Sequence, residues 1–187
     1  MSVKTDILIV GVGGQGTLLA SRVLGKYALE KGYDVKLSEV HGMAQRGGSV
    51  MTYVRIGDKI ASPLIDEGRA DVILAFEKLE ALRYLHYLKE GGQVIYSTQE
   101  IMPMPVVTGA AEYPQGIEEK LPGTGVDALT LALEAGNSKA ANSVMLGALC
   151  KKMGLDREVF EQALLSGIPP KTVEMNKKAF ELGYCAV

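Results

Sequence analysis

The chain contains 187 residues, a length that suits one domain with a full hydrophobic core. Hydrophobic residues make up 47% of it, charged residues 22%, and the formal net charge is −2, without the basic surplus of a nucleic-acid-binding domain. Its apolar runs stop well short of the ~20 residues of a membrane span, and no signal sequence precedes the first predicted strand. We therefore expect a cytoplasmic protein with no nucleic-acid or membrane partner.

The first forty residues predict a strand, a helix and a second strand. Residues 6–13 form a continuous apolar run, typical of a strand buried on both faces. Residues 15–31 carry apolar side chains at helical spacing, and Gly32 is expected to end that helix. Residues 34–40 indicate a second strand. The spacing is that of a βαβ unit, so we predict two parallel strands joined by a right-handed crossover.

The middle of the chain predicts further strands with one helix between them. Residues 50–56 alternate in polarity, and Gly57-Asp58 suggests a hairpin with a returning strand at residues 59–61. A buried strand is predicted at 70–76, a helix at 77–88 ended by Gly91-Gly92, and a strand at 93–97. Residues 106–113, after two prolines, allow two short extended pieces.

The last third of the chain changes character and predicts only helices. Four segments have helical spacing and are separated by glycine or proline turns: residues 127–135, 139–153, 157–166 and 171–182. Together the patterns predict a single α/β domain over residues 1–187. Its architecture is expected to be a three-layer, Rossmann-like fold with a mostly parallel sheet and a helical C-terminal section.

A glycine-rich loop follows the first predicted strand. The candidate cofactor-binding residues in it are Gly11, Gly13, Gly14, Gln15 and Gly16. Glycines let backbone approach a phosphate, and a helix N-terminus offers unpaired N–H groups and partial positive charge. Glu39 ends the second strand about where a ribose-binding acid of a dinucleotide site would fall. The motif alone is a weak signal, and a tight β–α turn or binding of an anion other than a nicotinamide dinucleotide is favoured over a dinucleotide site.

A second polar loop, residues 39–49, joins the second and third predicted strands. His41 and Arg46 are its candidate catalytic side chains, because histidine exchanges protons near neutral pH and arginine binds phosphate or carboxylate with two hydrogen bonds. Further candidates for contacts to a cofactor or anion are Gln45, Gly47 and Gly48. The alternative is that Arg46 pairs with Glu39 inside the domain. In a parallel sheet this loop and the first glycine loop would face one crevice.

Several chemistries lack their usual residues. The two cysteines, Cys150 and Cys185, are far apart, whereas iron–sulfur clusters need grouped thiolates, usually four. The sequence contains no nucleophile elbow, no zinc-binding spacing, no Gly-Lys-Ser/Thr phosphate loop and no Gly-Asp-Gly motif of a thiamine diphosphate site. We expect no metal ligand here. For Asn142, within a run of small residues, packing between helices is favoured over ligand contact.

The two loops together resemble the gamma-type domain of 2-oxoacid:ferredoxin oxidoreductases, and most closely the beta subunits of the indolepyruvate enzymes. Other segments agree with this resemblance over nearly the whole chain: residues 62–65, 70–85 and 168–171, with Asn176, Ala179 and Phe180. The Gln-Arg-Gly-Gly sequence at 45–48 is the specific part of the match. The glycine loop alone would not be.

The resemblance implies an accessory subunit in an oxidoreductase complex. A larger partner subunit would bind thiamine diphosphate with Mg²⁺ and iron–sulfur clusters, decarboxylate an aryl pyruvate such as indolepyruvate, and reduce ferredoxin while coenzyme A accepts the acyl group. The present chain would bind no cofactor tightly and be inactive alone. Its loops would complete the partner's site, facing coenzyme A, thiamine diphosphate or the oxoacid. A homodimer of the isolated chain is compatible with this implication.

Two other functions remain open at this stage. One is a free-standing NAD(P)-dependent oxidoreductase, supported by the glycine loop and Glu39. The other is a structural assembly module whose loops make only protein contacts. Titration of the isolated chain with NADH and NADPH would test the first alternative. Mutation of both loops would test the second, since it should weaken association without changing the chemistry of the complex.

Overall fold

The computed structural model describes residues 4–41 and 47–187, with His41 described by its backbone only. Six strands of the described residues form one sheet in the order β2-β3-β1-β4-β5-β6. Their bounds are β1 Lys4–Val12, β2 Asp34–His41, β3 Ser49–Gly57, β4 Ala70–Ala75, β5 Leu88–Ser97 and β6 Gly123–Val126. β1, β4, β5 and β6 run parallel to one another, whereas β3 is antiparallel to both of its neighbours, β1 and β2. The sheet is therefore mixed and mostly parallel, in an α/β fold.

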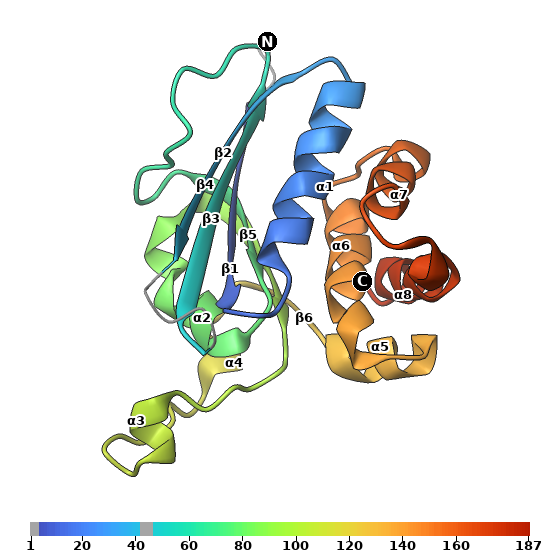
Figure 1. Ribbon diagram of the computed structural model, residues 1–187. Coiled ribbons are helices and arrows are strands. Elements are labelled where there is room, and N and C mark those ends of the chain that lie inside the picture. Colours follow the sequence, from blue (N-terminus) through green and yellow to red (C-terminus); the bar gives the residue numbers. More distant parts are fainter. Residues whose placement is uncertain (1–3, 42–46) are drawn as a thin grey trace.

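Helices cover both faces of the sheet (Figure 1). The larger layer contains α1 Thr17–Glu30, α5 Ala128–Ala135, α6 Ala141–Lys152, α7 Arg157–Leu165 and α8 Val173–Cys185. The other face carries α2 Lys78–Arg83 and α4 Ile117–Lys120, and α3 Met104–Val107 projects beyond the body of the fold (Figure 1). Short 3-10 turns occur at Leu85–Tyr87, Ser138–Ala140 and Pro170–Thr172. None of the described helices is long and apolar enough to cross a membrane.

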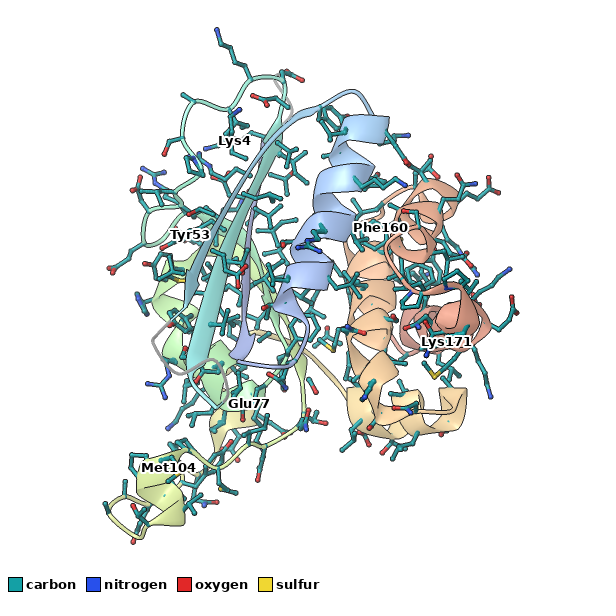
Figure 2. All side chains as sticks on the ribbon, viewed as in Figure 1. Lys4, Tyr53, Glu77, Met104, Phe160 and Lys171 are labelled. Carbon is teal, nitrogen blue, oxygen red and sulfur yellow. The ribbon has the colours of Figure 1, made fainter. Side chains whose placement is uncertain are left out.

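The larger core lies between the sheet and the C-terminal helices. Phe160 of α7 is fully buried there (Figure 2), with its ring centroid 5.4 Å from that of Tyr27 and 6.1 Å from that of Phe180. α6 and α8 approach so closely that a Cβ atom on Gly183 would lie 1.9 Å from the Val144 carbonyl oxygen. This tight layer holds the N-terminal end of α6 beside the edge of the sheet.

The two strands of the predicted βαβ unit, β1 and β2, run in the same direction as expected, but they are not neighbours in the sheet. β3 lies between them and pairs with both, so the real hairpin is β2–β3. The burial pattern explains this order. Val50, Val54 and Ile56 of β3 are buried, whereas Leu37 and Val40 of β2 are exposed and suit an edge strand. The short-range pattern identified both strands but could not assign their neighbours.

Three local predictions are wrong. The described residues 59–61 form no returning strand, and the Ile60 amide instead donates to the Asp34 carboxylate over 2.8 Å. The predicted helix at 77–88 ends earlier, because β5 already begins at Leu88 and continues through Gly91, whose φ is +74°. Residues 106–113 contain no extended pieces. Pro103 and Pro105 instead begin α3, since proline is tolerated in the first turn of a helix.

Candidate functional site

A cavity of about 450 Å³ opens at the carboxyl ends of β1, β4, β5 and β6. In open α/β sheets this edge is where ligands usually bind. Residues after three strands and at the start of the C-terminal helices line it: Gly14, Gln15, Gly16, Phe76, Ser97, Gln99, Ala128, Leu129, Ser138, Lys139, Ala141, Asn142 and Met145. Among these lining residues Lys139 is the single charged side chain. We call this space the glycine-loop cavity.

The first glycine loop takes the conformation that its glycines were predicted to allow. Gly14 and Gly16 have φ values of +103° and +85°, in the region that favours glycine. Gly16 precedes α1, lines the cavity and provides no side-chain cap for the first amides of that helix. Gly11 is needed for a different reason, because a Cβ atom there would lie 3.1 Å from Cβ of Phe76.

Gln15 joins the ends of three strands. Its Oε1 accepts from the Val12 amide over 2.8 Å, and its Nε2 donates to the Phe76 carbonyl over 2.9 Å and to Oε1 of Gln99 over 3.3 Å. These contacts connect β1 with the segments that follow β4 and β5. Gln15 was predicted as a cofactor-binding residue, and the structure places it in the cavity wall with its amide group engaged by the protein.

The two glycine loops meet at the same edge of the sheet. The Gly13 amide donates to the Gly48 carbonyl over 2.8 Å. Because β3 is antiparallel to β1, its first residues lie beside the last residues of β1, and Gly11 pairs with Val50. The described ends of the two loops are therefore neighbours, and the antiparallel β3 rather than a parallel β2 brings them together.

The second loop lies against a different cavity from the first. Gly47, with a φ of +77°, and Ser49 line a cavity of about 390 Å³ on the α2 face, together with side chains of α2 and residues 101–104. The described residues of the second loop thus line a different cavity from Gly14, Gln15 and Gly16. Gln45, Arg46 and the side chain of His41 lie outside the described residues.

Glu39 is not placed where a ribose-binding acid would be. In register it pairs with Thr52, which in turn pairs with Ile9, so Glu39 stands level with the middle of β1. It also lies on the edge strand, two strand spacings or ~10 Å from β1. A dinucleotide site needs this acid at the end of the strand next to β1. The insertion of β3 therefore removes the basis of that interpretation.

Two residues of the cavity wall were missed by the sequence interpretation, Lys139 as a site residue and Asn142 as more than a packing residue. Asn142 lies against Gly16, where its Nδ2 is 2.6 Å from the position of a Gly16 Cβ atom. The side chain of Asn137 accepts from the Lys139 amide over 2.9 Å and starts the turn that leads into α6. The Gly-Asn turn before a small-residue helix was the available signal for this N-terminus.

A further cavity of about 440 Å³ adjoins the glycine-loop cavity and shares Lys139 and Asn142 with it. It is also lined by Ile168, Pro169 and Lys171, within the segment that supported the family resemblance. Asn176 at its base is held from both sides, accepting from the Ser143 hydroxyl over 2.6 Å and donating to the Thr172 carbonyl over 2.9 Å. Two lysines thus border adjoining cavities.

Two buried carboxylates lie on α2, near the second loop. Glu77, 1% exposed, accepts from the amides of Glu80 and Ile101 over 2.8 and 3.2 Å and from the Tyr113 hydroxyl over 3.3 Å. Burial raises the pKa of Glu77 above its ordinary value. Glu80 accepts from the Ser49 hydroxyl and from Nε of Arg83. Neither acid was singled out from the sequence, because charged positions on a short helix are usually solvated.

The arrangement suits anion binding and orientation of a ligand. Backbone at two glycines, one of them the residue before the N-terminus of α1, and one lysine line the glycine-loop cavity. Among the described residues no group of three or more His, Cys, Asp or Glu could hold a metal ion. The two cysteines do not fit an iron–sulfur cluster either, since Cys150 is buried in α6 and Cys185 is exposed at the end of α8.

Comparison with known proteins agrees with the fold and the loops. A family model described as pyruvate ferredoxin/flavodoxin oxidoreductase matches residues 6–186. The indolepyruvate oxidoreductase subunit IorB of Thermococcus kodakarensis is 46% identical over 95% of this chain and 93% of its own. The ketoisovalerate oxidoreductase subunit VorA of Methanothermobacter marburgensis is 33% identical over 96% of this chain, but over 36% of its own length.

A solved structure supports the same assignment. The keto/oxoacid ferredoxin oxidoreductase gamma subunit from Geobacter sulfurreducens superimposes with a TM-score of 0.74, at 30% sequence identity, over 97% of both chains. The family match runs from β1 to the residue after α8, so it contains every described residue of the cavity wall. The resemblance inferred from the two loops is confirmed, and the chain belongs to the pyruvate ferredoxin/flavodoxin oxidoreductase family.

Proposed function

We propose that the chain is the accessory subunit of a 2-oxoacid:ferredoxin oxidoreductase that acts on indolepyruvate or another aryl pyruvate. Support for the substrate class comes from the relative named as an indolepyruvate oxidoreductase subunit, which the chain matches over nearly the full length of both. In this proposal residues 1–187 form a single domain. The partner subunit holds thiamine diphosphate and the iron–sulfur clusters, passes electrons to ferredoxin, and carries out the decarboxylation.

A fused relative supports the need for a partner. The chain corresponds to 36% of the VorA sequence, so in that protein the equivalent domain is covalently joined to a larger remainder. Separate chains that perform the same work would have to associate. The residue inventory agrees, because the donor set of this chain does not fit an iron–sulfur cluster, and carbanion chemistry is normally carried by a cofactor.

The glycine-loop cavity is the observation that carries the proposed role. Its volume of about 450 Å³ is within the usual range for a small-molecule site, and its single charged lining residue is the cation Lys139. The uncapped start of α1 adds further preference for negative charge. Coenzyme A is the co-substrate with phosphate groups in such a reaction. We assign its phosphates to this cavity, where Gly14, Gly16 and Lys139 would bind and orient them.

The second loop completes the partner's site in this proposal. His41 and Arg46 are its candidate side chains toward the oxoacid or the thiamine diphosphate, and Gln45, Gly47 and Gly48 its candidate backbone and amide contacts. Support comes from the contact between Gly13 and Gly48, which joins this loop to the wall of the glycine-loop cavity. A ligand spanning both loops would therefore meet them at one edge of the sheet.

Reconstitution tests the subunit role directly. The purified chain alone should not oxidise indolepyruvate, and ferredoxin-dependent, coenzyme A-dependent activity should appear when it is mixed with the partner subunit. Full activity from either chain alone would refute the proposal. An activity that depends on association but survives simultaneous replacement of both loops would instead support the assembly-module alternative.

Substitution of Lys139 tests the coenzyme A assignment. Lys139→Gln in the reconstituted complex should raise KM for coenzyme A roughly tenfold, as expected for loss of a charge-assisted contact, with little change in KM for the oxoacid. Lys152→Gln, at the opposite end of α6, makes the same charge change away from the cavity and is the matched control. An unchanged KM for Lys139→Gln would remove this residue from the coenzyme site.

The NAD(P)-dependent alternative has lost its main structural support. β3 separates β1 from the strand that carries Glu39, so the acid and the glycine loop do not form a dinucleotide site. Titration of the isolated chain with NADH and NADPH, followed by cofactor fluorescence, should show no saturable binding. Micromolar binding of either nucleotide would reinstate this alternative.

A further inference from the structure

The buried carboxylate of Glu80 binds the residue next to the junction of the two glycine loops. Gly48 accepts the Gly13 amide hydrogen bond, and the next residue, Ser49, begins β3. The Ser49 hydroxyl donates to Oε2 of Glu80 and lies 3.0 Å from the Tyr84 hydroxyl. The first residue of β3 is therefore bound to α2, a helix on the opposite face of the sheet from the glycine-loop cavity.

Glu80 is unusually placed for this contact. Its side chain is 6% exposed, and its other oxygen, Oε1, accepts from Nε of Arg83 over 3.0 Å. Its backbone amide donates to Glu77, which caps the start of α2. The backbone of Glu80 is thus fixed by its hydrogen bond to Glu77, and its Oε1 by Arg83. The other oxygen, Oε2, accepts from Ser49. Burying a charged side chain costs free energy of folding, and an apolar residue of similar volume would stabilise the fold at least as well.

We propose that Glu80 is a positioning residue for the carboxyl edge of the sheet. Acting through Ser49, it fixes Gly48 and hence the hydrogen bond from Gly13 that joins the two loops. Its effect on the reaction rests on the proposed function, because that function places the loops at a site shared with the partner subunit. Its effect on the loop junction does not, and can be measured on the isolated chain.

Hydrogen exchange of the Gly13 amide tests the junction. In Glu80→Leu, which keeps the side-chain volume but removes both acceptors, and in Ser49→Ala, this amide should exchange roughly tenfold faster than in the wild type. Glu80→Gln retains one acceptor oxygen for Ser49 and should preserve most of the protection. If Glu80→Leu fails to fold, Ser49→Ala alone decides the question.

The matched control is a buried acid at the other end of β1. Asp6, whose side chain is 3% exposed, accepts from Nε of Arg55 over 2.8 Å near Lys4, which lies at the opposite end of the sheet from Glu77 (Figure 2). Asp6→Asn should lower global stability without selectively exposing the Gly13 amide. The proposal is overturned if Gly13 exchange is unchanged in Glu80→Leu and Ser49→Ala. It is also overturned if exchange in Asp6→Asn, corrected for global stability, becomes faster by the same factor.

Kinetics of the reconstituted complex test the consequence for the reaction. Glu80→Leu should lower kcat roughly tenfold and leave KM for coenzyme A unchanged, since it does not touch Lys139 or Asn142, and Glu80→Gln should restore most of kcat. Faster Gly13 exchange with wild-type kcat would refute the positioning role. A complex whose activity does not require this chain at all would instead refute the proposed function, while leaving the exchange result intact.

Discussion

The contact between α6 and α8 and the loop between β1 and α1 both depend on glycine, for opposite reasons. At α6–α8, a Cβ atom on Gly183 would lie 1.9 Å from the Val144 carbonyl oxygen, and one on Gly147 would lie 2.1 Å from that of Phe180. In the loop, a Cβ atom on Gly14 would meet nothing within 4 Å. The helical layer lacks side chains so that backbones can touch. The loop lacks them so that space stays open.

This difference separates the part of the molecule that provides stability from the part that provides a site. The α6–α8 layer is rigid because it is filled, and it holds the N-terminus of α6, with Lys139 and Asn142 nearby, at the cavity. The loop can face a ligand because Gly14, near its centre, is exposed and carries no side chain. Each region should therefore respond differently to an added methyl group or to a reagent.

The largest effect is expected from adding a methyl group in the packed layer. Gly183→Ala should destabilise the chain by about 3 kcal/mol, because backbone rather than a flexible side chain must move to make room. The measurement is urea denaturation of the purified chain. Gly25→Ala is the matched control within α1, where a Cβ atom would meet the movable Cδ1 of Leu37 at 3.3 Å. Equal stability changes for the two variants would contradict the comparison.

A smaller effect is expected in the loop, where backbone strain dominates. Gly14→Ala and Gly16→Ala should each cost ~1–2 kcal/mol, since both residues have positive φ. Gly16→Ala should cost more, because its Cβ atom would displace the Asn142 amide, and a second substitution, Asn142→Ala, should remove this excess. Urea denaturation of the wild type, Gly16→Ala, Asn142→Ala and the double variant forms the double-mutant cycle. Additive effects would show that the Gly16–Asn142 contact is not limiting.

A third effect is the pH dependence of stability caused by Glu77. This residue lies near the carboxyl edge of the sheet but is as buried as residues of the helical layer. Burial raises the pKa of Glu77 above its ordinary value near 4.5, so the folded state holds the proton more tightly than the unfolded chain. Stability should therefore fall as pH rises from that value through the raised folded value. Glu77→Gln should lack this loss and gain relative stability with pH, as denaturation at a series of pH values would show. A difference in stability between Glu77→Gln and the wild type that does not change with pH would contradict this prediction.

The smallest effect involves the two thiols and should leave stability unchanged. Burial raises the pKa of Cys150 to about 11, and this residue lies inside the packed layer, whereas Cys185 is exposed. Iodoacetamide at mildly alkaline pH should label Cys185 in the native chain and Cys150 only after unfolding. Mass spectrometry of the alkylated chain gives the count at each position. Rapid labelling of Cys150 without unfolding would show that the layer opens more readily than its packing suggests.

The parts of the site that could be predicted are those whose backbone geometry follows from residues close together in the sequence. The first loop lies between a buried strand and a helix because its glycines permit positive φ, and only glycine suits such a turn. The family resemblance followed from the second loop. Lys139 and Glu80 could not be found in this way, because each acquires its role from segments distant in the sequence. Lys139 lines the same cavity as Gly14 and Gly16, and Glu80 accepts a hydrogen bond from Ser49.

The sequence by itself determined most of the longer helices and strands, the two glycine loops and the membership of the family, because hydrophobic period and turn residues act over a few positions. The tertiary structure alone decided which strands are neighbours. β3, more buried than β2, entered the sheet beside β1 and left Glu39 on the edge. Burial of apolar surface, which favours this order, is a property of the whole sheet that no short segment encodes. The glycine motif that resembles a dinucleotide site therefore lies at the junction of the two loops instead.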